Sequence, residues 1–332
     1  MQGRSGQDAI RDNSPSESTD LSIIVPCHNE SDSIPELTRS VHDIMGAELP
    51  QVSYELILID DGSTDKTASA IEDECRRSQC VSGLLFSRNF GKEAAMLAGL
   101  REASGDFVLI MDADLQHPVS LIPTLFKTIT TQPVEQVIAR RDRAGDGVWR
   151  TFISRLYYRS VNALVDVTLE DGAGDFRILS RVAVDALLQL NETNRFSKGL
   201  FSWIGFPTEV IEYPNVTRKA GKSSWSTRSL VNYGIDGVLA FNAKPLRLVV
   251  YLGAATFGLA LAYLLFLFVQ YVSFGIETPG YLTTIGVITL FGGAELFALG
   301  IIGEYVGRLY QESKARPHYL IHRRLGRGPE VE

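Results

Sequence analysis

Short apolar runs, rich in β-branched residues, alternate with longer amphipathic stretches over the first two thirds of the chain. Runs of this length without polar interruption are typical of strands that are buried on both faces of a sheet. The stretches between them are predicted to be helices, the first of which begins near Ser33 with Pro35 in its first turn. We therefore expect an α/β domain with a mostly parallel sheet, covered by helices, over residues 21–225. The predicted strands span residues 21–26, 54–60, 82–87, 106–112 and 135–140.

Two much longer apolar stretches lie closer to the C-terminus. Residues 248–270 contain no charged side chain, and residues 281–303 contain only Glu295. Each is long enough to cross a bilayer, which takes about 20 residues, so we predict two antiparallel transmembrane helices within residues 247–305. A pair of buried core helices is the alternative. Residues 226–246 look amphipathic and are predicted to form an interfacial helix, with an ordinary packing helix as the alternative.

Charge at the ends of the two predicted spans indicates their orientation. Lysine and arginine residues flank the pair on its outer sides, whereas the loop between the spans contains neither. Because such flanking cations stay in the cytoplasm, we expect both termini and the α/β domain to be cytoplasmic. Residues 1–20 are polar and are predicted to be a disordered tail without the apolar core of a signal peptide. Residues 306–332 are predicted to be a basic cytoplasmic tail.

Composition and missing motifs exclude several classes of protein. The formal net charge of −7 argues against a nucleic-acid partner that is held by overall charge. The three cysteines include no CxxC pair, which argues against a disulfide framework or a structural zinc site and favours a reducing compartment. The sequence GxGxxG is absent after the first strand and GxxxxGK[ST] is absent throughout, so neither a dinucleotide-binding dehydrogenase nor a P-loop enzyme is favoured.

Acidic and amide side chains gather where predicted strands end. In sheets of this kind ligands bind beyond the carboxyl ends of the strands. Asp112 and Asp114 leave the fourth strand one residue apart, and two such carboxylates can share Mg²⁺ or Mn²⁺ with a diphosphate. By itself Asp-x-Asp is also common in surface turns. Asn29 and Glu30 follow the first strand, and Asp60 and Asp61 follow the second.

Several segments, in order, resemble one family. The first four are similar to the nucleotide-sugar half of a family 2 glycosyltransferase with the GT-A fold; they are IVPCHNE (24–30), DDGSTDKT (60–67), SRNFGKEAAMLAG (87–99) and DADLQHP (112–118). Four further segments resemble the bacterial polyprenyl-phosphate glycosyltransferases of the bactoprenol glucosyltransferase kind; they are residues 172–181, 195–206, 218–226 and 300–321. The resemblance covers nearly all of the chain except its two ends.

This resemblance implies an activity and a setting. The expected reaction is inverting transfer of a sugar, glucose from UDP-glucose, to polyprenyl (undecaprenyl) phosphate at the bacterial cytoplasmic membrane. The product is a polyprenyl-monophosphate sugar, and the family points to a homo-oligomer, a tetramer. Two alternatives stay open: the same reaction with another donor of the GDP-mannose, UDP-N-acetylglucosamine or aminoarabinose type, and a non-catalytic membrane scaffold that only binds a nucleotide.

The resemblance also implies a donor site. Asp112 and Asp114 match the catalytic and metal-binding motif, with Asp114 as the direct ligand of the divalent metal. Turn capping is the alternative for the aspartate and asparagine residues, and His117 is expected to be a turn residue rather than a ligand. The residues implied in donor binding are Pro26, Asn29, Glu30, Asp60, Asp61, Lys92, Asp112 and Gln116.

A second group of residues is implied on the acceptor side. Asp175 matches the position that the family assigns as catalytic base. A lipid phosphate has a second pKa of about 6 and is already ionised at pH 7, so we expect Asp175 to orient the acceptor or Arg177 instead of removing a proton. A loop aspartate that caps a helix is the alternative. Cations suited to the acceptor phosphate, each of which is otherwise a solvated surface charge, are Arg140, Arg177, Arg218 and Lys222.

Overall fold

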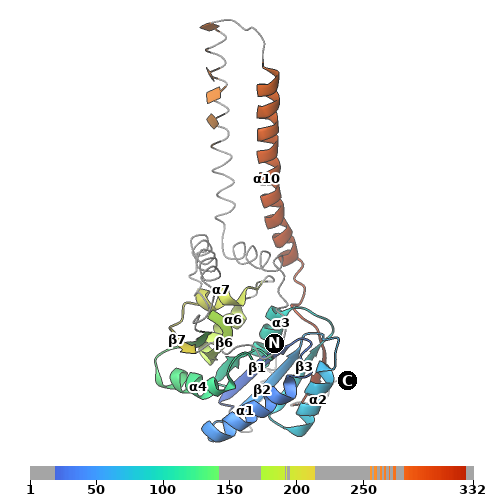
Figure 1. Cartoon of the computed structure of the whole chain (residues 1–332), viewed down its shortest axis with the longest axis vertical. Coiled ribbons are helices and arrows are strands. Elements are labelled where there is room, and N and C mark those ends of the chain that lie inside the picture. Colours follow the sequence, from blue (N-terminus) through green and yellow to red (C-terminus); the bar gives the residue numbers. More distant parts are fainter. Residues whose placement is uncertain are drawn as a thin grey trace, which may run out of the picture.

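The computed structural model describes residues 19–141, 173–190, 192, 195–213 and 280–326, together with isolated positions between 255 and 273. In Figure 1 an α/β domain occupies one end of the molecule and the long helix α10 extends away from it. The strands are β1 (Leu21–Cys27), β2 (Tyr54–Asp60), β3 (Val81–Phe86), β4 (Phe107–Ile110), β5 (Gln136–Arg141), β6 (Ala173–Ser180), β7 (Thr208–Tyr213) and β8 (Ile321–Leu325). The helices are α1 (Ile34–Glu48), α2 (Thr67–Arg77), α3 (Lys92–Glu102), the short 3-10 helix η1 (Val119–Leu121), α4 (Ile122–Thr131), α6 (Arg181–Gln189), α7 (Ser197–Trp203) and α10 (Tyr281–Ser313).

The strands form one eight-stranded mixed sheet in the order β7-β5-β6-β4-β1-β2-β3-β8. Neighbouring strands from β4 to β3 run parallel, whereas β6 is antiparallel to both β4 and β5. The five strands predicted from apolar runs correspond to β1–β5, and the mostly parallel α/β sheet is confirmed. Because β6 lies between β4 and β5 and runs antiparallel to both, residues at the start of β6 lie beside those that follow β4.

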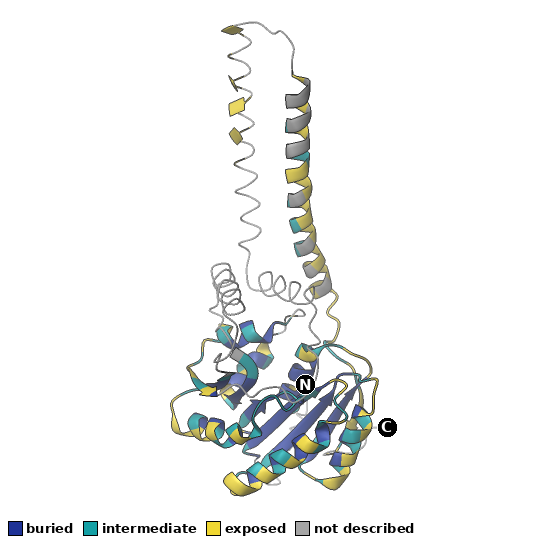
Figure 2. Cartoon of the chain, viewed as in Figure 1, coloured by how far each residue is buried: buried dark blue, intermediate teal, exposed yellow. Residues whose placement is uncertain are grey.

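Helices cover both faces of this sheet, as Figure 2 illustrates by the burial of the strands. Side chains of β1 alternate between the two faces: Ile23 and Val25 pack with α1, α2 and α4, and Ile24 packs with α3, α6 and α7. All three are fully buried, as expected for a strand with apolar side chains at successive positions. Pro35 lies in the first turn of α1, as predicted.

The C-terminal part differs from the predicted basic tail over residues 306–332. Helix α10 continues to Ser313, and the chain then returns to the domain, where β8 pairs antiparallel with β3. Leu325 lies close to the backbone of Gly83, where an added Cβ would be 3.4 Å from Leu325 and 2.6 Å from Ile71. This strand was not predicted, because β8 is short and its partner lies far away in the sequence.

The membrane-related predictions fall largely outside the residues that the structure describes. Within the described part of the chain, no helix combines the length and the apolar character that crossing a membrane requires. Helix α10 includes the predicted span over residues 281–303. The predicted interfacial helix over residues 226–246, and all but isolated positions of residues 248–270, are not described, and the predicted N-terminal tail is described only at residues 19 and 20.

Candidate active site at the carboxyl ends of the strands

The loops that follow β1 and β2 are joined by hydrogen bonds. Asn29 has a left-handed backbone (φ 58°), and its side-chain oxygen accepts a hydrogen bond from the Thr64 amide at 2.9 Å. The Glu30 amide donates to the Thr67 hydroxyl at 2.9 Å. Pro26 lies on β1 beside Ile59 of β2. Asn29 and Glu30 therefore lie on one connected pair of loops, and Pro26 lies near the end of the strand that leads into them.

Asp60 and Asp61 are both 3% exposed, and their carboxylates bind backbone amides. Asp60 accepts a hydrogen bond from the Ser63 amide at 3.1 Å. Asp61 accepts from the amides of Phe90 at 2.7 Å and Gly91 at 2.9 Å. Burial raises the pKa of Asp61, and the two amide hydrogen bonds partly offset that rise. These contacts have the geometry of the turn-capping alternative, and a donor-binding role for the pair stays a prediction.

The glycine that follows this pair permits a close approach between two loops. Gly62 has a φ of 61°, and a Cβ at this position would lie 2.2 Å from the carbonyl carbon of Arg88. No other residue fits there without moving the backbone. The loop from β2 thus packs directly on the segment that leads into α3.

The loop after β4 carries the Asp-x-Asp motif. The Asp114 carboxylate accepts a hydrogen bond from the backbone amide of Gln116 at 3.1 Å and another from the side-chain amide of Gln116. Between them Leu115 has a φ of 55°, a conformation that costs energy for a residue with a Cβ. The loop turns sharply at this point, which keeps Asp114 and Gln116 side by side.

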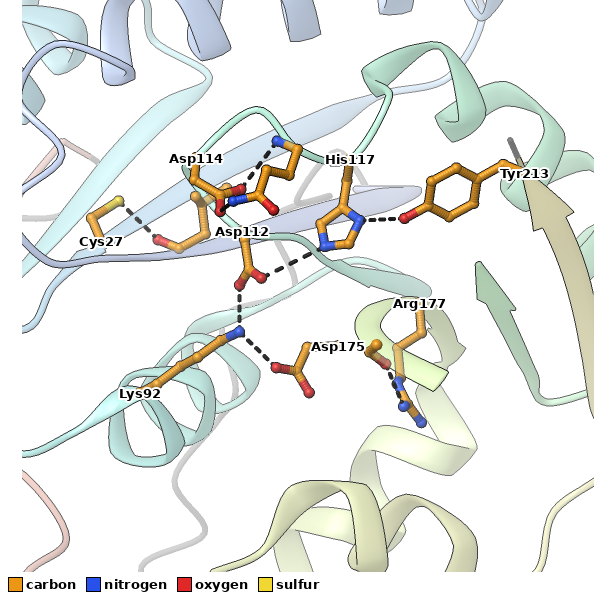
Figure 3. A network of polar contacts seen from close by, with 11 residues as sticks. Cys27, Lys92, Asp112, Asp114, His117, Asp175, Arg177 and Tyr213 are labelled. Atoms are coloured by element: carbon orange, nitrogen blue, oxygen red, sulfur yellow. Dashed lines mark hydrogen bonds and ion pairs between the residues drawn. The ribbon is translucent and has the colours of Figure 1, made fainter. Parts of the chain in front are cut away.

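Lys92 joins the donor motif to the predicted acceptor side, as Figure 3 shows. Its ammonium lies 2.5 Å from Asp112 Oδ1 and 2.6 Å from Asp175 Oδ2. Lys92 is the first residue of α3, and Asp61 holds the two amides just before it. A buried carboxylate thus sets the start of the helix, and the helix start sets the position of the lysine.

The pKa values of this cluster keep its members charged at neutral pH. Burial alone would lower the pKa of Lys92, but Asp175 and Asp112 raise it above its usual value. Burial alone would raise the pKa of Asp112, but His117 and Lys92 lower it below the usual range. The pKa of Asp175 is lowered in the same way, against its burial, by Lys92 and Lys198.

The predicted acceptor cations are placed differently from one another. Arg177 is 2% exposed, donates to the Gly174 carbonyl at 2.8 Å and lies 3.8 Å over the Phe201 ring. Arg140, on β5, forms an ion pair with Glu212 of β7 at 2.6 Å. The structure therefore brings Lys92, Asp112 and Asp175 together, and it turns the Arg177 side chain into the protein. Arg218 and Lys222 lie outside the described residues.

Two further side chains lie near the cluster. The sequence motifs predicted only a turn role for His117 and no role for Lys198. His117 was expected to be a turn residue, yet its ring lies between Asp112 and the buried Tyr213 (Figure 3). Lys198, on α7, adds a second positive charge near Asp175. The only signals in the sequence were the position of His117 beside the Asp-x-Asp motif and that of Lys198 within residues 195–206.

The side-chain oxygens in the loop after β4 suit a divalent cation that is shared with a diphosphate. No group of three His, Cys, Asp or Glu side chains that could hold a metal occurs among the described residues. Mg²⁺ in such sites needs only one or two carboxylates when substrate phosphates complete its coordination. Among those residues, Asp114 receives hydrogen bonds only from Gln116, whose amide presents a carbonyl oxygen when it rotates. Asp114 and Gln116 thus fit a shared ion, whereas Asp112 is held by Lys92.

Comparison with known proteins identifies the family. The model of glycosyl transferase family 2 matches residues 22–188, and that of the GtrB C-terminal hairpin matches residues 244–309. "Putative glycosyltransferase CsbB" of Bacillus subtilis (strain 168) is 48% identical over 303 residues, which cover 91% of this chain and 91% of that protein. "Bactoprenol glucosyl transferase" of Shigella phage SfV is 37% identical over 302 residues, which cover 91% of this chain and 97% of that protein.

A solved structure, glucosyl-3-phosphoglycerate synthase from Mycobacterium tuberculosis, matches with a TM-score of 0.44 and 19% identity over 65% of this chain and 76% of that chain. So low a likeness says nothing about substrates. The two family models and the relatives confirm the resemblance that the ordered motifs predicted. The chain therefore belongs to glycosyl transferase family 2, and it is a glycosyltransferase with a GtrB-type C-terminal hairpin.

Proposed function

We propose that this glycosyltransferase moves glucose from UDP-glucose to polyprenyl phosphate, with inversion, at the cytoplasmic face of a bacterial cytoplasmic membrane. The observation that carries the proposal is the double contact of Lys92, which holds Asp112 of the donor motif and Asp175 of the acceptor segment at 2.5 and 2.6 Å. Relatives that match over 91% of the chain and bear the name bactoprenol glucosyl transferase support the lipid acceptor and the sugar.

The reaction is a single displacement at the anomeric carbon. A phosphate oxygen of the lipid forms the new bond to that carbon, the bond to the diphosphate oxygen breaks, and UDP leaves with the electron pair. The acceptor phosphate has a second pKa of about 6 and needs no base at pH 7. The contribution of the protein is to hold both substrates in line, which is worth a large part of the barrier.

Charge is the main difficulty in such a site, because a lipid phosphate must approach a diphosphate and two carboxylates. Lys92 offsets the charges of Asp112 and Asp175, and Lys198 adds to the positive potential at Asp175. From their positions in the sequence, we infer that Arg218 and Lys222 also bind the acceptor phosphate. Asp175 then orients Lys92 and the acceptor instead of removing a proton.

A divalent cation, Mg²⁺ or Mn²⁺, belongs to this proposal. Asp114 and Gln116 would hold it, because their oxygens suit a hard cation and the diphosphate would supply further ligands. When bound, the ion neutralises charge that develops on the diphosphate. Asp112 stays beside Lys92, where it contributes to the placement of the sugar.

We further propose that residues 248–270 and 281–303 cross the membrane as an antiparallel pair. The apolar length of both segments supports this, as does the match of the GtrB C-terminal hairpin to residues 244–309. Strand β8 follows this region and pairs with β3 of the same sheet. A chain that returns to the sheet it left makes an even number of crossings. Assembly into a homo-oligomer stays a prediction.

The experiment that tests the function is a transfer assay in membranes that contain the protein. UDP-glucose, UDP-galactose, UDP-N-acetylglucosamine and GDP-mannose are offered separately, each labelled, with polyprenyl phosphate and with or without Mn²⁺. We expect glycolipid from UDP-glucose only, dependent on the metal, and reduced at least about 100-fold in Asp114→Asn. The surface variant Asp73→Asn serves as a control, since Asp73 is exposed on α2, where it forms an ion pair with Arg76 of the same helix.

Two outcomes would contradict the proposal in different ways. Glycolipid from another donor would change the sugar and keep the reaction. If UDP binds but none of the four donors yields glycolipid, then glucose is not the sugar that is transferred, and a rarer donor takes its place.

A further inference from the structure

The carboxylate of Asp112 is held from two sides by different elements. Lys92, from α3, lies 2.5 Å from Oδ1, and Nε2 of His117, from the loop after β4, lies 3.6 Å from Oδ2 (Figure 3). Each oxygen thus faces its own partner. A carboxylate with two different partners cannot rotate without leaving one of them, so the pair fixes its orientation as well as its position.

His117 is itself held in place by its surroundings. Its Nδ1 lies 2.8 Å from the hydroxyl of Tyr213, and its ring lies on Phe176, with the ring centroids 5.0 Å apart. Phe176 is fully buried and Tyr213 is 4% exposed, so both supports belong to the core. When the Tyr213 hydroxyl donates to Nδ1, the remaining N–H of the ring is at Nε2 and faces Asp112.

The position of Tyr213 connects this arrangement to the acceptor side. Tyr213 is the last residue of β7, where it pairs with Arg141 of β5. In the sequence it lies shortly before Arg218 and Lys222, the predicted ligands of the acceptor phosphate. The hydroxyl of Tyr213 is therefore a contact between the end of β7 and the donor motif, through His117.

We propose that Tyr213 and His117 are positioning residues for the transfer reaction: Tyr213 orients His117, and His117 fixes the Asp112 carboxylate in the geometry that the nucleotide sugar needs. This inference rests on the proposed glycosyl transfer and adds two residues to it. Both act through Asp112, so neither is a catalytic residue. Loss of either side chain is expected to lower kcat more than it changes KM, because a misplaced group near the reacting centre lowers the rate more than it weakens binding.

The test is a set of small substitutions in the membrane transfer assay. Tyr213→Phe removes only the hydroxyl, and we expect kcat to fall about 10-fold while KM for UDP-glucose changes less than about twofold. His117→Ala removes the whole contact and is expected to lower kcat about 100-fold. His117→Gln keeps an N–H donor on a side chain of similar reach and is expected to recover part of the activity of His117→Ala.

The chain contains its own matched control. His42 and Tyr54 form a second histidine–tyrosine pair, between α1 and the first residue of β2, at the opposite end of that strand from Asp60. Tyr54→Phe removes a hydroxyl from a pair of the same kind, and we expect its kcat to equal that of the wild type. The melting temperatures of all variants, in the same detergent, show whether a loss of rate is only a loss of fold.

Several results would overturn the positioning roles. They are a wild-type kcat in Tyr213→Phe, an effect confined to KM, no difference between His117→Gln and His117→Ala, or equal losses in Tyr213→Phe and Tyr54→Phe. The variants are also compared for slow hydrolysis of UDP-glucose without lipid, where the same ranking is expected. If the wild type hydrolyses the donor but makes no glycolipid, the acceptor is wrong, and the ranking in hydrolysis still decides the roles of the two residues.

Discussion

At the scale of single residues, Lys92 connects the two halves of the site, because it pairs with both Asp112 and Asp175. Ion pairs on a protein surface contribute little to stability, yet this one joins two motifs that lie 83 residues apart. Its place is set by Asp61, whose carboxylate holds the amides of Phe90 and Gly91 at the start of α3. Asp61 thus affects the site through the backbone, without touching Asp112 or Asp175 in the contacts described.

Asp175 offers a test of whether the reaction needs a base. Its pKa is lowered, so the carboxylate stays ionised from pH 5 to 8 and is too weak a base to produce an acidic limb in that range. The acceptor phosphate has a second pKa of about 6. We expect kcat/KM of both the wild type and Asp175→Asn to rise through that pH, with the variant about 10- to 100-fold slower because it loses the charge that holds Lys92.

The measurement is kcat/KM from pH 5 to 8.5 at saturating metal. Asp185→Asn, at an exposed position on α6, is the control for removal of a carboxylate. If the acidic limb is present in the wild type and absent from Asp175→Asn, Asp175 is a true base.

Residue types at the site were predictable, but their contacts were not. The motifs indicated that Asp112, Asp114 and Asp175 belong to one site, because such residues recur in a fixed order in the family. That Arg177 turns onto Phe201, and that His117 contacts both Asp112 and Tyr213, depends on the strand order β7-β5-β6-β4. Strand order is not encoded in the spacing of a local motif.

At the scale of elements, β8 changes how the C-terminal part is understood. It covers the outer edge of β3 with backbone hydrogen bonds, packs Leu325 near Ile71, and forms ion pairs from Arg323 to Glu72 and from Arg324 to Glu102. The arginines are about half exposed, so those ion pairs are weak. The strand pairing and the burial of Leu325 carry most of its stabilising effect.

Removal of β8 is therefore expected to destabilise the domain. A chain that ends at residue 320 leaves β3 as an open edge, and we expect its melting temperature to fall by about 5–10 °C, since 1 kcal/mol corresponds to about 2–4 °C in a domain of this size. A chain that ends at residue 326 keeps β8 and is expected to melt like the full-length protein. Equal melting temperatures for the two truncated chains, measured in the same detergent, would contradict a stabilising role for β8.

The elements that were predicted and those that were missed differ in a physical way. β1–β5 are apolar runs bounded by polar residues, a pattern that is visible locally. β8 contains two arginines and a histidine among its five residues, and it is a strand only because the edge of β3 is available. Edge strands expose one side to solvent and therefore lack the continuous apolar run of a central strand.

At the scale of the whole molecule, the shared sheet restricts membrane topology. The N-terminal domain and β8 lie on either side of the predicted spans in the sequence and belong to one sheet. If the spans cross the bilayer, the segments before and after them are on the same side. This agrees with the flanking cations, which predict a cytoplasmic location for both.

Variants with one accessible cysteine test this topology. In a background with Cys75 and Cys80 replaced by serine, only the buried Cys27 is left of the natural cysteines. In this background we expect Glu277→Cys, in the predicted loop between the spans, to react with a membrane-impermeant maleimide in right-side-out vesicles. Gly328→Cys, after β8, is expected to react only in inverted vesicles, because it follows a strand of the catalytic domain. Labelling of both positions from the same side would rule out the two-span arrangement.

The amino-acid sequence alone was enough for the α/β class, the central strands, the family and the residue types of the site. Those properties follow from local apolar patterns and from motifs whose members lie close together in the chain. The insertion of β6 between β4 and β5, the return of β8, the bridge from Lys92 to Asp175 and the contact of His117 with Tyr213 were visible only in the folded chain. Each of these joins segments that are distant in sequence, and which segments meet is set by the packing of the whole sheet.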